Sequence, residues 1–157
     1  MARRPLVFAL AAVGLFLGAT PARADVTAFW GVSTPETRSV RGLSAGLSLV
    51  LFGFEFEYAN TTEDLTAGVP GLVTGMFNGL VQTPTSTQFY VTAGGGVFRE
   101  RLESTGETHV GTNIGGGVKL NLVGPLRLRL DYRIFNLRGA ALHARPQRFY
   151  AGVNLAF

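Results

Sequence analysis

The chain has 157 residues, of which 46% are apolar, and its lack of cysteine excludes disulfides, thiol catalysis and cysteine-based metal sites. Its formal net charge is +4, but three arginines fall within the first 24 residues, and the remainder carries eleven basic and ten acidic residues. That balance excludes an extended basic surface for nucleic acid. Beyond residue 24 no run of 18 apolar residues occurs, so helical membrane spans are not expected.

Residues 1–24 have the pattern of a secretory signal. Two arginines precede an apolar run of about 14 residues, which is shorter than the ~20 that a transmembrane helix needs. Small residues then occupy Ala22 and Ala24, at the spacing that a signal peptidase requires. We therefore expect cleavage after Ala24, which leaves Asp25 at the start of a single domain of residues 25–157.

The rest of the chain alternates between apolar and polar residues, in segments separated by turn-forming residues. A period of two residues is typical of β-strands with two unlike faces. The predicted strands are Val26–Thr34, Ser39–Val50, Gly53–Thr61, Leu72–Gln82, Gln88–Leu102, His109–Leu122, Leu126–Leu137 and Gln147–Phe157.

The segment Leu72–Gln82 permits two interpretations. Val73, Phe77 and Val81 could form the outward face of a strand, but the spacing of Leu72, Met76 and Leu80 also fits a helix. A strand is favoured because it makes the number of strands even.

The connections between these strands alternate in length. Short turns are expected at Leu51–Phe52, Pro84–Ser86 and Val123–Pro125, and longer loops at residues 35–38, 62–70, 103–108 and 139–146. Short turns at one end and longer loops at the other are typical of a transmembrane barrel, with the turns on the periplasmic side. An even strand number places both chain ends on that side.

In the stretch "LRLRLDYRIF" at 126–135, leucines and arginines lie on opposite faces of one strand, and two kinds of barrel differ in which face points inward. A soluble lipocalin-like barrel would turn its leucines inward, whereas a membrane barrel would turn its arginines inward. The polar faces of the other strands are rich in Gly, Ser and Asn, and Lys119 is the single lysine, which favours a crowded polar lumen. Aromatic residues near the strand ends predict two interfacial belts, Phe54, Phe89 and Phe157 at the turn side and Tyr58, Phe98, Phe135 and Phe149 at the loop side.

With the polar faces inward, charges of both signs share a confined space and must pair or lose solvation energy. We hypothesise an internal salt-bridge network that fills and closes the barrel. Its candidate members are Glu55, Glu57, Lys119, Arg127, Arg129, Asp131, Arg133 and Arg148.

The repeated glycines in "AGGGVF" and "IGGGVK" lie on the polar parity of their strands and are expected to make room for guanidinium groups. The alternative is that they only ease strand curvature. A hairpin centred between Thr105 and Gly106 would place Gly94 opposite Gly117 and Gly96 opposite Gly115. Pairing about the next two connections would put Gly115 beside Arg133, Gly117 beside Asp131, and Gly152 on the other side of Arg133.

The region 25–157 resembles the small eight-stranded outer-membrane barrels of the OmpA/OmpX and opacity-protein type. The resemblance rests on the signal, the alternating strands and the ending Tyr150-x-Gly152-x-x-Leu155-x-Phe157. That ending is similar to the signal read by the outer-membrane assembly machinery. The resemblance implies contact with outer-membrane lipid and lipopolysaccharide. The chain lacks the peptidoglycan-binding domain of longer relatives, so cell-wall anchoring is not expected.

An eight-stranded barrel has an interior just large enough for side chains. We therefore expect a non-enzymatic bacterial outer-membrane protein without a cofactor, which stabilises the envelope or presents loops to a partner that the sequence does not identify. The alternatives are a small gated pore, a soluble periplasmic lipocalin-like binding barrel, and a lipid-modifying enzyme at the rim. The candidate residues for that enzyme are Glu103, Ser104, Glu107, His109 and His143.

Overall fold

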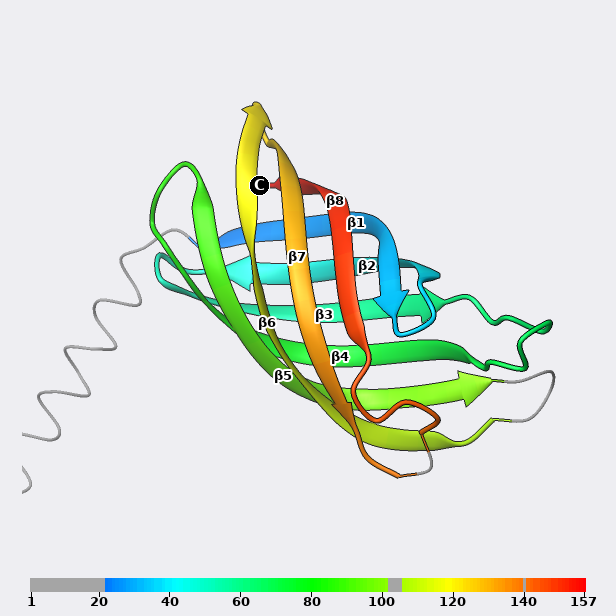
Figure 1. Cartoon of the computed structure of the whole chain (residues 1–157). Coiled ribbons are helices and arrows are strands. Elements are labelled where there is room, and N and C mark those ends of the chain that lie inside the picture. Colours follow the sequence, from blue (N-terminus) through cyan, green and yellow to red (C-terminus); the bar gives the residue numbers. More distant parts are fainter. Residues whose placement is uncertain (1–21, 102–105, 140) are drawn as a thin grey trace, which may run out of the picture.

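The computed structural model describes residues 22–101, 106–139 and 141–157, and within them the chain forms a closed antiparallel barrel of eight strands (Figure 1). Consecutive strands pair, and the last pairs with the first, which confirms the predicted fold class. No helix of the described residues is long and apolar enough to cross a membrane. The strands are β1 (Arg23–Thr34), β2 (Arg38–Ser48), β3 (Phe52–Thr61), β4 (Gly71–Gln82), β5 (Gln88–Arg101), β6 (Thr108–Val123), β7 (Leu126–Leu137) and β8 (Gln147–Ala156).

The ambiguous segment is a strand, β4, which pairs with β3 and β5 along its length. Leu72, Met76 and Leu80 are buried inside the barrel, whereas Phe77 and Val81 are exposed. Residues four apart share a face in a strand as well as in a helix. The spacing of Leu72, Met76 and Leu80 therefore could not distinguish a strand from a helix. The strand interpretation was right.

The expected signal segment lies mostly outside the described residues. The expected cleavage point after Ala24 falls inside β1, because Arg23 and Ala24 already pair with Ser48 and Leu47 of β2. We call the end of the barrel that holds Arg23 and Phe157 the turn end, and the opposite end, which holds the connection 62–70, the loop end.

The outside of the barrel is apolar and its inside is polar. Leu43 and Leu47 are each 58% exposed, whereas Arg129 and Arg133 are 0% exposed. A water-soluble barrel has the opposite arrangement, because exposed leucine costs hydration free energy and buried guanidinium groups cost desolvation. The structure is therefore that of a barrel surrounded by lipid, and the lipocalin-like interpretation is wrong.

The predicted aromatic belts are found in part. Phe54, Phe89 and Phe157 are exposed near the turn end, and Tyr58 and Phe149 are exposed on the outer wall toward the loop end. Phe98 and Phe135, in contrast, are each 1% exposed and point into the lumen. Both residues have the parity of the polar face of their strands, so nearness to a strand end was a poor guide to their direction.

The predicted register of β5 with β6 is wrong by four residues. Gly94 pairs with Asn113 and Gly96 pairs with Gly111. Pairing continues as far as Arg99 opposite Thr108, which centres the connection two residues earlier than expected. The register that forms places Tyr90 opposite Gly117, where a Cβ would lie 2.8 Å from Cζ of the tyrosine ring. Glycine at 117 thus leaves room for the Tyr90 ring.

The expected contact of Gly152 with Arg133 is also wrong, since Gly152 pairs with Arg129 and Arg133 pairs with Arg148. Main-chain hydrogen bonds between β7 and the last segment of the chain continue beyond Gln147, the predicted start of the last strand. Leu137 donates a main-chain hydrogen bond to Ala144 at 2.8 Å, so the loop is shorter and centred earlier than the sequence suggested. The pairs Gly115 with Arg133 and Gly117 with Asp131 are confirmed.

Candidate functional site

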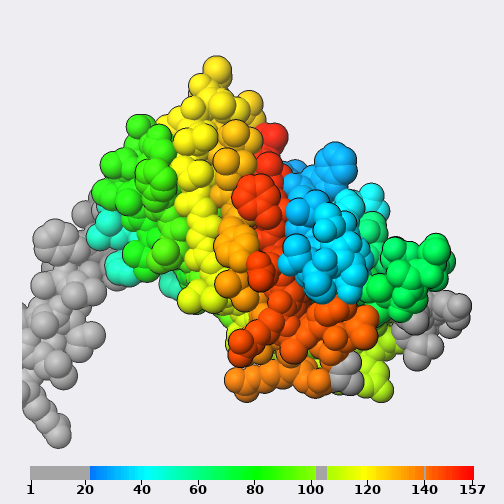
Figure 2. All heavy atoms as spheres, in the orientation of Figure 1, coloured from blue at the N-terminus to red at the C-terminus, as the bar shows by residue number. Residues whose placement is uncertain are grey.

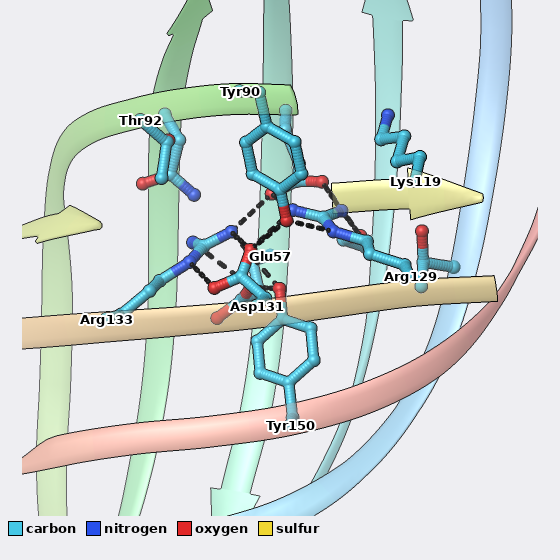
Figure 3. A network of polar contacts seen from close by, with 12 residues as sticks. Glu57, Tyr90, Thr92, Lys119, Arg129, Asp131, Arg133 and Tyr150 are labelled. Atoms are coloured by element: carbon cyan, nitrogen blue, oxygen red, sulfur yellow. Dashed lines mark hydrogen bonds and ion pairs between the residues drawn. The ribbon is translucent and has the colours of Figure 1, made fainter. Parts of the chain in front are cut away.

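A cluster of charged side chains crosses the middle of the barrel (Figure 3). β3 and β7 lie on opposite sides of the ring of eight strands, and β8 is next to β7. Alternation turns every second residue of each strand inward, so the carboxylates of β3 face the guanidinium groups of β7 and β8. We call this cluster the central network, and its members are Glu55, Glu57, Tyr90, Arg129, Asp131, Arg133, Arg148 and Tyr150.

Arg129 lies on β7 and contacts side chains of β3 and β5. Its two terminal nitrogens contact both oxygens of Glu55, with Nη2 to Oε1 at 3.2 Å, and Nη2 also lies 3.0 Å from Oδ2 of Asp131. Its Nε donates to the hydroxyl of Tyr90 at 2.8 Å, and that hydroxyl in turn donates to Asp131. All nitrogen atoms of this guanidinium group therefore have partners, as buried charge requires.

Arg133 connects all three carboxylates of the network. Its Nε lies 2.9 Å from Oδ1 of Asp131, its Nη2 lies 2.9 Å from Oε1 of Glu55, and its Nη1 lies 3.1 Å from Oε2 of Glu57. Nη2 also donates to the hydroxyl of Tyr150 at 3.2 Å. Because the carboxylates come from β3 and β7, this side chain joins opposite walls of the barrel.

Arg148 completes the network toward the loop end. Its Nη1 donates to Oε1 of Glu57 at 3.0 Å and its Nη2 donates to the hydroxyl of Thr74 on β4 at 3.3 Å. The hydroxyl of Tyr150 donates to the other oxygen of Glu57 at 3.0 Å. The guanidinium group also lies over the ring of Phe135, 4.5 Å from its centroid, an arrangement that favours a cation.

The central network balances its charge. Its three carboxylates, Glu55, Glu57 and Asp131, face three guanidinium groups, and all six residues are at most 2% exposed. Separating such groups from water costs several kcal/mol per ion unless each is paired. The loss of one member would therefore leave an uncompensated charge in the lumen.

Glycines provide the space that the large side chains occupy. A Cβ on Gly115 would overlap the carbonyl oxygen of Tyr132 and would lie 2.8 Å from Cγ of Arg133. On Gly152 a Cβ would lie 2.8 Å from Cβ of Phe29, whose ring stacks on Tyr150 with centroids 4.0 Å apart. The geometry therefore supports the expected space for a guanidinium side chain at Gly115, whereas Gly152 leaves room for Phe29 instead.

Two of the expected charged residues lie outside the central network, toward the turn end. Nζ of Lys119 lies 2.7 Å from Oδ2 of Asp25 in a separate buried pair. Arg127 donates to the amide oxygen of Gln88 at 2.9 Å. Sequence reasoning missed Asp25 as the partner of Lys119, although the inward parity of β1 contained the signal.

An apolar cluster fills the lumen on the loop-end side of the central network. Its buried members are Leu72, Met76, Phe98, Phe135 and Leu137. Residues from β4, β5 and β7 meet here because each has the inward parity of its strand. This cluster covers the charged groups with side chains that exclude water.

Of the rim residues proposed for an enzyme, the two histidines, which the structure describes, pair with different carboxylates. Nε2 of His109 lies 3.3 Å from Glu107, whereas Nε2 of His143 lies 2.9 Å from Glu36. Glu103 and Ser104 lie outside the described residues. Among the residues that the structure describes, no group of three or more His, Cys, Asp or Glu side chains could hold a metal ion.

The residues of the expected assembly signal divide between the two faces of β8. Tyr150 and Gly152 face the lumen, whereas Leu155 and Phe157 are exposed on the outside. The last residue is held by main-chain hydrogen bonds of 2.9 Å in both directions with Ala24 of β1. The end of the chain is thus part of the strand pairing that closes the barrel.

No family model matches the chain, and no curated protein matches it either. Solved barrels do match. Neisserial surface protein A superimposes with a TM-score of 0.68 at 16% identity, over 87% of this chain and 97% of that one. The N-terminal barrel domain of OprF from Pseudomonas aeruginosa gives 0.66 at 16% identity, over 86% and 97%. The outer-membrane enzyme PagL gives 0.55 at 12%, over 83% and 98%. The chain therefore has the fold of a small outer-membrane barrel, a fold that also carries an enzyme.

Proposed function

We propose that the protein is a closed, non-enzymatic integral barrel of the bacterial outer membrane that stabilises the envelope and carries an ordered external rim. The apolar outer wall fits a lipid environment, in which outer-membrane lipid and lipopolysaccharide would surround it. The central network fits a structural role, because its three carboxylates and three guanidinium groups form ion pairs with one another.

The observation that carries this proposal is the filled lumen. Side chains that line a water-filled passage have surface that water can touch, but Glu57, Arg129 and Arg133 are each 0% exposed. The apolar cluster adds a second layer between the central network and the loop end. A steady conductance would require both layers to rearrange, so we favour a closed barrel over a pore.

The rim is held together by contacts between separate connections. Glu36, in the connection from β1 to β2, pairs with His143 at 2.9 Å, and Arg38 donates to main-chain carbonyls of the connection from β3 to β4. Glu100 of β5 accepts from the main-chain nitrogen of Leu142 at 3.1 Å. Short, mutually bonded loops provide a fixed surface for an external partner.

Fractionation of cells and electrophoresis together test this proposal. We expect the full-length protein in the outer-membrane fraction, with faster mobility unboiled than boiled, because the sealed barrel resists detergent. In planar bilayers the purified protein is expected to give no steady conductance. Recovery in the soluble periplasm without a mobility shift would contradict the membrane assignment, and a stable open conductance would contradict the closed lumen.

Deletion of Phe157 tests the proposed recognition by the assembly machinery. We expect much less folded protein in the outer membrane, although the purified variant should still refold in detergent, because the deletion removes one exposed side chain and only one pair of main-chain hydrogen bonds between β1 and the end of β8. Folded protein is measured by heat-dependent mobility in cells and after refolding in vitro. The matched control is Phe89→Ala, which removes another exposed aromatic near the turn end. Equal assembly of both variants would contradict a role for Phe157 as a signal.

A further inference from the structure

The outer wall has a hollow of about 290 Å³ where β6 and β7 approach the loop end. Figure 2 shows β6, β7 and β8 side by side on this wall, with residues 141–146 near its loop end. Thr112 pairs with Asn136 and, one step toward the turn end, Ile114 pairs with Ile134. All four side chains point outward, and Arg145 from the loop completes the lining.

The lining changes in character along the strands. Ile114 and Ile134 are exposed apolar residues of the outer wall, Thr112 and Asn136 offer a hydroxyl and an amide, and Arg145 adds a positive charge. Asn113 and Phe135 also line the hollow, but their side chains are buried in the lumen. This order of apolar, polar and cationic groups matches a lipid molecule from its acyl chain to its phosphate.

Carboxylates distinguish this hollow from two others at the loop end. One of those is lined by Glu63 and Arg101, and the other by Arg38 together with Glu36, Glu63 and Asp64. Carboxylates repel an anion, whereas the lining of the hollow between β6 and β7 includes none. The charge of its lining therefore favours an anionic occupant.

We propose that this hollow binds the phosphate headgroup of an anionic membrane lipid, with an acyl chain along Ile114 and Ile134. The inference deepens the proposed function and rests on it, since it requires the outer wall to face lipid. Arg145 donates two hydrogen bonds to the phosphate oxygens through its planar guanidinium group. The amide of Asn136 and the hydroxyl of Thr112 donate to the same headgroup.

Native mass spectrometry of the full-length protein in detergent micelles tests the site, with phosphatidylglycerol and phosphatidylcholine as the two probes. We expect the unaltered protein to retain phosphatidylglycerol preferentially. Arg145→Ala should bind it about tenfold more weakly, which corresponds to about 1.4 kcal/mol, and Arg145→Lys should retain part of the preference. Arg41→Ala is the matched control, because Arg41 is an exposed arginine on β2, on another part of the barrel wall.

Several outcomes would overturn the inference. Equal retention of both lipids would indicate that the lipid is held by apolar contacts alone. Equal losses of phosphatidylglycerol binding in Arg145→Ala and Arg41→Ala would indicate that any exposed arginine of the wall attracts the anionic lipid. Displacement of the lipid by millimolar inorganic phosphate would indicate a site for the free ion. Heat-dependent mobility is measured on the same samples, so that loss of the barrel, which would contradict the proposed function, is distinguished from loss of this site alone.

Discussion

Replacement of Arg133 by methionine is expected to lower the free energy of unfolding by about 3–5 kcal/mol, because the change leaves buried carboxylates without their partner. Glu55, Glu57 and Asp131 all contact this guanidinium group, and methionine offers none of its hydrogen bonds. The measurement is urea unfolding of the barrel in vesicles, followed by the fluorescence of Trp30, the single tryptophan.

Two control variants distinguish the loss of charge balance in the lumen from a nonspecific loss of stability. Arg41→Met removes an exposed arginine and should change stability by less than about 0.5 kcal/mol. The double variant Glu57→Gln with Arg133→Met removes one charge of each sign, so it should be less unstable than the sum of its two single changes. A loss below about 1 kcal/mol for Arg133→Met, which is typical of an exposed ion pair, would contradict the central network.

Replacement of Gly115 by leucine is expected to destabilise the barrel by about 3 kcal/mol or to prevent folding, because overpacking against main-chain atoms cannot relax. The new Cβ would overlap the carbonyl oxygen of Tyr132 and press on Arg133. Folded protein is measured by heat-dependent mobility, and stability is measured by urea unfolding.

Gly75→Leu is the matched control for this prediction. Gly75 is also a strand glycine, but a Cβ there meets the nearest atoms, in Phe56 and Val97, at an ordinary 3.9 Å. If the glycines only ease strand curvature, both substitutions should cost similar stability. If Gly115 provides space for Arg133, its replacement alone should be severe, and an unchanged barrel would contradict the packing role.

The features that depend on single strands could be predicted from the sequence. Alternation with a period of two is local, so the inward parity of Arg129, Arg133 and Glu55 followed directly from it. The same parity would have placed Phe98 and Phe135 in the lumen. Their apolar character and their position near strand ends suggested a membrane belt instead. An apolar cluster inside a polar lumen requires three-dimensional packing that the pattern of one strand does not contain.

The features that depend on pairing between strands were harder to predict. Register follows from where each connection is centred, and a change of two residues in that centre shifts the partners by four. This is why the partners expected for Gly94 and Gly152 were wrong, whereas the short turn between β6 and β7 gave the right partner for Gly115. The inward direction of the central network residues was still predicted correctly, because a change of register by an even number of residues keeps every side chain on the same face of its strand.

The pairing of β1 with β8 has a consequence for the order of folding. Seven of the eight strand pairs join neighbours in the chain, but this one joins its two ends, and Asn154 bonds to Thr27 across 127 positions at 2.8 Å. Contacts this distant in sequence slow folding, because the chain loses much entropy before they form. Until they do, both edge strands present unpaired main-chain groups that another chain could bind. The unfolded chain is therefore prone to aggregate until β8 pairs with β1.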